Sequence, residues 1–179
     1  MPSLLTRLPW ACRGLLLALL LGSGLARGDV VNDVHALMAK GELQSALRLS
    51  AAAMASNVQD PQARFLHAVV LMELRRDTDA LQAFTQMSQE YPELPEPFNN
   101  LALLHVRGGR LELARQSLET ALRNDPGHRA ARANLGEVYL MLAVQAWQQA
   151  GSNGPLDARL TRRLEAARAL LATAGPSAR

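Results

Sequence analysis

The sequence predicts an all-α protein, an α-solenoid of helix–turn–helix repeats with a capping helix at its C-terminal end. The main observation is a fixed spacing, because the small residues Ala46, Ala80 and Ala114 are separated by equal intervals. Prolines that can end a helix recur at the same interval, at Pro92 and Pro126. Between such prolines, apolar residues follow the i, i+3, i+4, i+7 pattern of amphipathic helices.

Composition agrees with closely packed helices. The chain has 179 residues, which suits one domain with an extension. Hydrophobic residues make up 49% of the sequence but aromatic residues only 4%, so the core has to be built from leucine and alanine. The single cysteine, Cys12, excludes an internal disulfide.

Residues 1–28 are typical of a secretion signal. Arg7 and Arg13 precede the apolar run Leu15–Leu21, which is too short to span a bilayer comfortably. The small residues that follow predict cleavage after Ala26 or Gly28, and hence a periplasmic or otherwise exported protein. The alternative is an uncleaved segment that anchors the chain in the inner membrane, and only in that case do we expect contact with a membrane.

The positive net charge is concentrated in this N-terminal segment. The chain carries 19 basic and 16 acidic residues, and residues 1–28 contain Arg7, Arg13 and Arg27 but no acid. Removal of the segment leaves as many basic as acidic side chains. The basic character of the full chain is therefore no argument for a nucleic-acid partner.

Residues 29–58 and 61–92 are expected to form the first two repeats. Gly41 provides the turn of the first, since glycine enters the left-handed region without a Cβ penalty. The dipeptide Asp60-Pro61 begins the second, with a capping residue followed by proline at the first helical position. We expect the turn of this repeat at Asp77–Asp79.

Residues 95–126 form the most regular unit, two helices joined by Gly108-Gly109. A degenerate fourth repeat is expected over residues 129–150, either as one long helix or as two helices fused by a deletion. Residues 155–174 then form the capping helix, because terminal repeats must cover the open end of a stack with a polar outer face. The alternative for this arginine-rich helix is a surface that lies on an anionic membrane.

A helix–turn–helix unit with a period of about 34 residues resembles the tetratricopeptide repeat, whose signature is W-x2-L-G-x2-Y, then A-x3-F, then P. The third unit matches those positions with Phe98, Leu101, Ala102, His105, Ala114, Leu118, Ala121 and Pro126. The second matches with Ala68, Leu71, Ala80, Phe84 and Pro92. The fourth matches with Leu135, Gly136 and Tyr139, and the resemblance covers roughly residues 30–147. We expect two helices to approach closely at Ala114 and at Gly136.

The resemblance implies a concave groove lined by the first helix of each repeat, and a protein or peptide partner bound there. Asn100 and Asn134 match the asparagine position of relatives that grip a C-terminal carboxylate. The lysine and arginine partners are missing except Arg107, so we expect inter-helix hydrogen bonds from both asparagines instead. The implied groove residues are Phe65, Val69, Met72, Asn99, Leu103, Val106, Arg107 and Glu137.

No residue pattern predicts catalysis, a metal or a cofactor. The four histidines do not fall at ligand spacing on one helix face, and no nucleophile or phosphate-loop motif occurs. The sequence therefore predicts a non-enzymatic scaffold or adaptor of the bacterial cell envelope that binds a peptide or helix. The alternatives are a self-associating structural protein and a membrane-anchored accessory factor of an envelope assembly complex.

Overall fold

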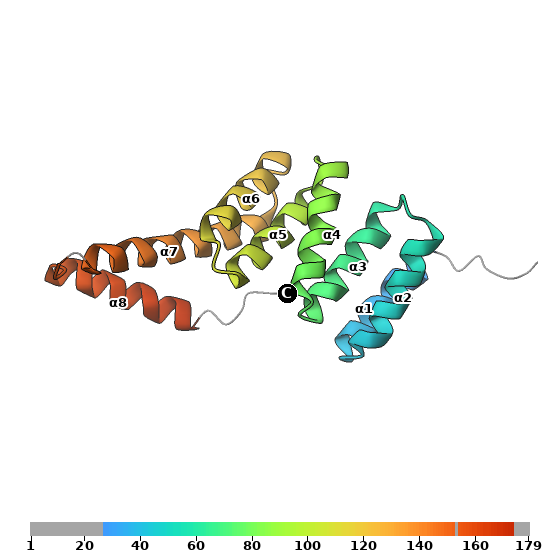
Figure 1. Ribbon diagram of the computed structural model, residues 1–179, viewed down its shortest axis with the longest axis horizontal. Helices are drawn as coiled ribbons and strands as arrows, with labels where there is room; N and C mark the ends of the chain where they lie inside the picture. Colours follow the sequence, from blue (N-terminus) through green and yellow to red (C-terminus); the bar gives the residue numbers. More distant parts are fainter. Residues whose placement is uncertain (1–26, 153, 174–179) are drawn as a thin grey trace, which may run out of the picture.

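The structure is a computed structural model that describes residues 27–152 and 154–173. Within these residues every element of regular secondary structure is an α-helix. The helices are stacked side by side into an extended, curved array (Figure 1). The predicted all-α class is confirmed. In chain order the helices are α1 (Arg27–Ala39), α2 (Leu43–Ser56), α3 (Pro61–Glu73), α4 (Asp77–Glu90), α5 (Pro95–Arg107), α6 (Leu111–Asn124), α7 (Arg129–Ser152) and α8 (Ala158–Thr173).

The helix boundaries reproduce the sequence period. The first helices of the repeats, α1, α3, α5 and α7, begin at positions 27, 61, 95 and 129, which are equally spaced. The second helices α2, α4 and α6 begin at positions 43, 77 and 111, at the same interval. The predicted start of α3 is confirmed, because the Asp60 carboxylate accepts a hydrogen bond from the backbone N–H of Gln62 at 3.0 Å and Pro61 is the first helical residue.

Each helix pair turns through one residue in the left-handed region. These residues are Gly41, Arg75 and Gly109, with φ of 77°, 60° and 69°. The predicted turn at Asp77–Asp79 is wrong: the chain turns around Arg75, and both aspartates lie in the first turn of α4. Their carboxylates face the positive end of the helix dipole there, which explains acidic residues immediately after the turn.

The same backbone hydrogen bond closes all three turns. The N–H of Arg76 donates to the carbonyl of Leu71 at 3.0 Å, five residues back. Glu42 bonds to Leu37 at 2.9 Å and Arg110 to His105 at 2.8 Å in the same way. This is the pattern of a Schellman ending, which requires a left-handed residue just before the donor.

The core lies between the helices and is divided into one cluster per repeat. Ala46, Ala80 and Ala114 are each 0% exposed, as the spacing predicts. Each lies in one buried cluster with a residue of the preceding helix and residues of the following one. In the third repeat, for example, Ala114 of α6 shares its cluster with Ala102 of α5 and Val138 of α7.

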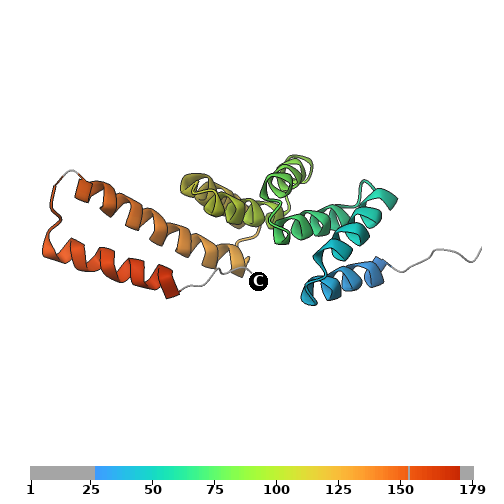
Figure 2. The ribbon, with the colours of Figure 1, turned by 60° about the horizontal axis from the view of Figure 1, so that its bottom comes forward.

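The fourth repeat lacks its second helix. Residues 129–152 form the single helix α7, which continues through the position where the earlier repeats turn. The chain then reverses, and α8 runs back along the C-terminal half of α7 at the end of the stack far from α1 (Figure 2). The capping helix is shorter than the predicted 155–174, since α8 begins at Ala158, where the carboxylate of Asp157 caps the N–H of Leu160 at 2.7 Å.

Helix α8 packs on a different face of α7 from the one that contacts α5 and α6. Val138 lies in the cluster with α5 and α6, whereas Leu140 and Val144 pack with Leu164 and Ala167 of α8. Leu140 follows Val138 by two residues, which is about 200° around a helix. Helix α7 is therefore held between the repeat stack and α8.

This arrangement overturns the expected close approach at Gly136. Ala102, which holds the equivalent position one repeat earlier, is covered by α6 and is fully buried. Gly136 is exposed, and a Cβ built on it meets nothing within 4 Å. The side chain of Tyr139, one turn further on, is 49% exposed for the same reason: no second helix follows to cover this face of α7.

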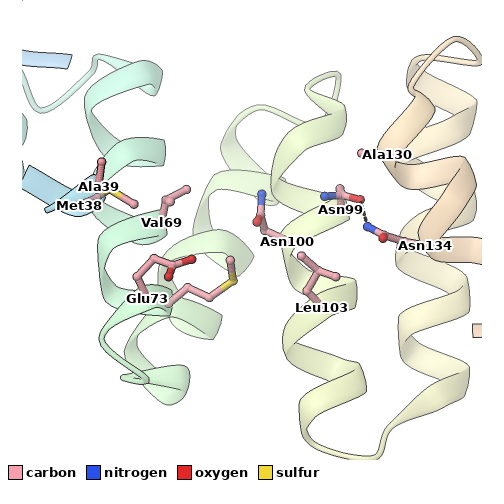
Figure 3. A pocket seen from close by; sticks show the side chains of 10 residues that line it. Met38, Ala39, Val69, Glu73, Asn99, Asn100, Leu103, Ala130 and Asn134 are labelled. Carbon is pink, nitrogen blue, oxygen red and sulfur yellow. Dashed lines mark hydrogen bonds between the residues drawn. The ribbon is translucent and has the colours of Figure 1, made fainter. Parts of the chain in front are cut away.

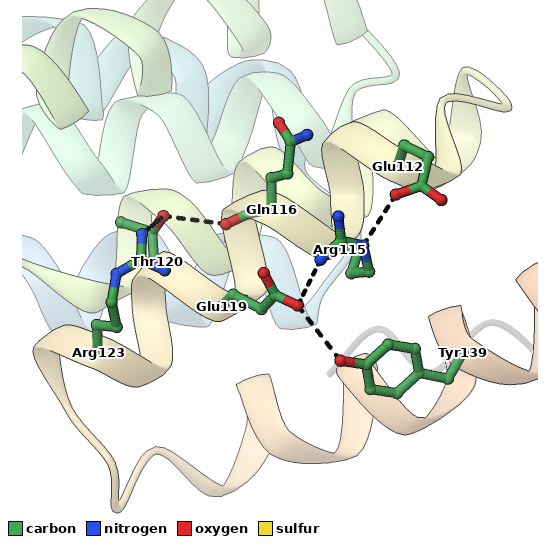
Figure 4. A network of polar contacts seen from close by, with 7 residues as sticks. All are labelled: Glu112, Arg115, Gln116, Glu119, Thr120, Arg123 and Tyr139. Carbon is green, nitrogen blue, oxygen red and sulfur yellow. Dashed lines mark hydrogen bonds and ion pairs between the residues drawn. The ribbon is translucent and has the colours of Figure 1, made fainter.

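A polar network on α6 reaches this open face. Arg115 pairs with Glu112 at 2.8 Å and with Glu119 at 2.6 Å, and the hydroxyl of Tyr139 donates to Glu119 at 3.3 Å (Figure 4). Hydrogen bonds from Arg115 to Glu112, and then to Glu119, raise the pKa of this guanidinium above its ordinary value. Glu112 is exposed and Arg115 and Glu119 are partly exposed, so we expect the network to orient α7 against α6 more than to stabilise the fold.

Substitutions of the left-handed turn residues test the turn assignment, because we expect changes of opposite sign in the free energy of unfolding at equivalent positions. Replacing Arg75 by glycine removes a Cβ from a left-handed residue and should raise the free energy of unfolding by about 1 kcal/mol. Gly109→Ala introduces that Cβ at the same point of the next turn and should lower the free energy of unfolding by about 1–2 kcal/mol. Urea denaturation followed by circular dichroism measures both. Equal signs for the two variants would contradict the turn assignment.

The two small residues of the repeat pattern should likewise respond differently to leucine. Ala114→Leu overpacks a filled cluster and should cost about 1–3 kcal/mol of stability. Gly136→Leu points a side chain into open space and replaces a poor helix former, so it should be stabilising by up to ~1 kcal/mol. The denaturation midpoints of the two variants measure this difference, and a comparable loss in both would restore the close approach at Gly136.

Candidate functional site

The inner faces of the first helices enclose a groove of about 570 Å³. This volume lies within the roughly 300–1,000 Å³ typical of ligand clefts. Helices α1, α3, α5 and α7 all contribute to it, so four successive repeats share one surface (Figure 3). The lining residues are Met38, Ala39, Val69, Met72, Glu73, Asn99, Asn100, Leu103, Ala130 and Asn134.

The groove crosses the helices obliquely. Met38 and Ala39 come from the last turn of α1, whereas Ala130 comes from the first turn of α7. Val69, Met72 and Glu73 belong to the second half of α3. A ligand that follows this path would contact the C-terminal ends of α1 and α3 and then the N-terminal end of α7.

Two of the groove asparagines are hydrogen-bonded to each other, and the third is hydrogen-bonded to the backbone. The amide of Asn134 donates to the side-chain oxygen of Asn99 at 2.9 Å, linking α7 to α5. The amide of Asn100 donates to the carbonyl of Glu96 at 2.9 Å, within α5. The predicted inter-helix hydrogen bond is thus confirmed for Asn134 and wrong for Asn100, whose partner lies one turn back in its own helix.

Arg107 makes its contacts within the protein, between α5 and the preceding repeat. Its guanidinium donates to the carboxylate of Asp77 at 2.9 Å and to the carbonyl of Met72 at 3.2 Å. These contacts tie α5 to the turn between α3 and α4. Arg107 does not line the groove, and its charge is paired with that of Asp77.

Four of the eight sequence-derived groove residues line the groove and four lie elsewhere. Phe65 packs edge-to-face on the buried Phe84, with ring centroids 5.6 Å apart, in the core between α3 and α4. Val106 packs against the cluster of α5, α6 and α7. Glu137 is partly buried on α7 and already takes part in an interaction within the fold. The four that line the groove are Val69, Met72, Asn99 and Leu103.

Sequence reasoning missed two groove residues of the first repeat. Met38 and Ala39 lie one repeat period before Met72 and Glu73, so extending the repeat phase back by one unit would have identified them. The predicted partner-binding residues came from the second, third and fourth repeats only. The groove therefore extends into the first repeat, from which no individual groove residue was predicted.

A serine–histidine pair between α2 and α3 is structural. The hydroxyl of Ser50 lies 3.1 Å from Nδ1 of His67, across the two helices. Ser50 is fully buried, so a substrate cannot reach it. Burial is the main cause that lowers the pKa of His67, and the nearby charge of Arg76 lowers it further.

His105 on α5 behaves in the same way. Burial, and to a smaller extent the charge of Arg110, lowers its pKa, and its Nδ1 accepts a hydrogen bond from Arg110 Nε at 3.2 Å.

Neither a metal centre nor a membrane span is found in the part of the chain that the structure describes. Within residues 27–152 and 154–173, no group of three or more His, Cys, Asp or Glu side chains is placed to hold a metal ion. None of the helices in those residues combines the length and the hydropathy that crossing a bilayer requires.

Comparison with known proteins gives a consistent fold. The family model described as tetratricopeptide repeat matches residues 33–95 and 99–178. A thermophilic TPR protein of Thermus thermophilus is 23% identical, with a TM-score of 0.62 over 82% of this chain and 83% of that one. A search of curated proteins found no match to this chain.

Two similar structures contain bound peptides. The type III secretion chaperone SycD of Yersinia enterocolitica, in complex with a peptide of the translocator YopD, is 12% identical with a TM-score of 0.54 over 82% of this chain and 95% of that one. The second TPR domain of human RPAP3, in complex with the HSP70 peptide SGPTIEEVD, is 18% identical with a TM-score of 0.54 over 60% and 90%. At these identities the likeness establishes the fold.

Proposed function

The chain belongs to the tetratricopeptide repeat family, and we propose that it is a non-enzymatic scaffold that binds a peptide segment of a partner protein in its concave groove. The observation that carries this proposal is the groove itself. Four helices from successive repeats line it, and the lining combines aliphatic side chains with asparagine amides.

The lining suits an extended peptide. Val69 and Leu103 offer aliphatic contacts, and Met38 offers a flexible side chain that adapts to different partners. The amides of Asn99, Asn100 and Asn134 keep unused donors and acceptors that can bond to a peptide backbone. Apolar anchors surrounded by polar groups are the usual composition of a peptide-binding surface.

The peptide complexes of SycD and of human RPAP3 support this proposal by similarity of fold. A peptide in the groove of this chain would touch several repeats at once. Its affinity would therefore depend on the curvature of the stack, which the alanine contacts of the core set.

Filling the groove should weaken peptide binding without disturbing the core. Ala130 is exposed at the groove, so Ala130→Trp adds bulk there, and Ala52→Trp is a matched control at an exposed position of α2 outside the groove. Short peptides selected from a random phage library on the purified chain should bind with dissociation constants of about micromolar. We expect Ala130→Trp to weaken them by at least about tenfold and Ala52→Trp to leave them unchanged. Equal affinities for both variants would place the binding site elsewhere.

We also propose that the protein is exported and acts in the bacterial cell envelope, as a periplasmic scaffold. The support lies in the sequence: Arg7 and Arg13, the apolar run Leu15–Leu21 and the small residues that follow. Cleavage after Ala26 would leave every residue of α1 in place, and cleavage after Gly28 would remove only the first two. Either product retains the whole groove.

N-terminal sequencing tests the export proposal. The mature chain isolated from a bacterial envelope fraction should begin at Arg27 or Asp29. A variant with Leu17→Arg and Leu19→Arg interrupts the apolar run, so it should stay unprocessed in the cytosol. Full-length wild-type protein in the cytosol would refute export, and full-length protein in the membrane fraction would favour the anchored alternative.

A further inference from the structure

We propose that the groove selects a basic peptide, an extended segment that presents a lysine or arginine side chain beside aliphatic residues, over an acidic one. This inference rests on the proposed function, because it names the chemistry of the peptide that the same groove would bind. The preference depends on which charges the groove offers and which it has already neutralised.

The charge of the groove is negative. Of the described residues that line it, Glu73 alone is ionisable. Its side chain is exposed and turned from α3 toward Asn100 and Leu103 of α5 (Figure 3). Within residues 27–152 and 154–173, the Glu73 side chain makes no hydrogen bond or ion pair. A cationic side chain in the groove would therefore gain a charge-assisted hydrogen bond without displacing an existing partner.

No comparable positive group faces a ligand from the described lining. Arg107, which the repeat pattern assigned to the groove, is paired with Asp77 at 2.9 Å and with the carbonyl of Met72. An acidic ligand that recruited the charge of Arg107 would compete with Asp77 for it, and the Arg107 contacts also hold α5 to the preceding turn. The loss of those contacts would offset the attraction that a carboxylate gains.

The helix ends on the α1–α3 side of the groove add to the same preference there, whereas the N-terminal end of α7 at Ala130 carries the opposite partial charge. Ala39 is the last residue of α1 and Glu73 the last residue of α3, so the groove lies against the C-terminal ends of both helices. Helix C-termini carry a partial negative charge and favour cations within the last turn. We therefore place the basic side chain of the peptide near Glu73, at the end of the groove that α1 and α3 form.

The asparagines do not favour either sign. Asn99, Asn100 and Asn134 are neutral, and each retains both donor and acceptor capacity. They suit the backbone of the peptide, whatever its side chains. Val69, Leu103 and Met38 contribute aliphatic contacts, so the neighbours of the basic side chain should be aliphatic.

Three peptides of equal length separate these charge preferences. The acidic probe is SGPTIEEVD, the peptide of the human RPAP3 complex. The basic probe is SGPTIKKVK-amide, and the neutral probe is SGPTIQQVN-amide. Fluorescence anisotropy at low salt on the purified full chain should show the basic probe bound about tenfold more tightly than the other two. Ala130→Trp should weaken this binding by at least about tenfold.

Charge substitution at the groove provides the decisive comparison. Glu73→Gln should remove the preference for the basic probe, and Glu73→Lys should reverse it. Glu165→Gln and Glu165→Lys are matched controls, because Glu165 is exposed on α8 outside the groove and changes the net charge equally. Both should leave the preference at about tenfold. Circular dichroism confirms that each exposed substitution keeps the helical content.

Three results would overturn the inference. The acidic or neutral probe could bind as tightly as the basic one, the preference could survive Glu73→Gln, or none of the three probes could bind. The proposed function is judged separately, by whether library-selected peptides of any charge lose affinity in Ala130→Trp and keep it in Ala52→Trp. Failure of charge selection is thus distinct from failure of peptide binding.

Discussion

The close approach of two helices at one alanine per repeat is the contact on which the rest of the structure depends. Ala46, Ala80 and Ala114 are completely buried, and each belongs to a cluster that joins three consecutive helices. Because a methyl group lets helices approach closely, each helix pair can pack against the next helix at the equivalent position of its repeat. This repetition arranges the first helices of the four repeats along one curved surface, which forms the groove.

Loss of the period at α7 determines how the stack ends. Without a turn near Met141, α7 continues and leaves Gly136 and Tyr139 uncovered. Helix α8 then packs on the face that carries Leu140 and Val144, opposite the face held by α5 and α6. Helix α8 covers this face of the last repeat helix, and the groove ends on α7 with Ala130 and Asn134.

The groove shows how a shared fold acquires its own chemistry. Its walls occupy the positions that the repeat assigns to the concave face, but its single ionisable lining residue among those described is Glu73. The arginine that the pattern places nearby is neutralised by Asp77. The scaffold therefore sets where a peptide could lie, whereas a few side chains decide which charge it would carry.

The sequence by itself determined the helical class, the phase of the repeats and the buried alanines, because a period fixes which residues return to the same face. It also placed four groove residues, Val69, Met72, Asn99 and Leu103, and extending its phase would have added Met38 and Ala39. Only the tertiary structure decided that Arg107 pairs with Asp77 and that Phe65 packs on Phe84. It also decided the turn at Arg75 and the exposure of Gly136. Those outcomes depend on which helix packs against which face. The period of the sequence cannot show that the second helix of the fourth repeat is missing, or which residue of another helix a side chain contacts.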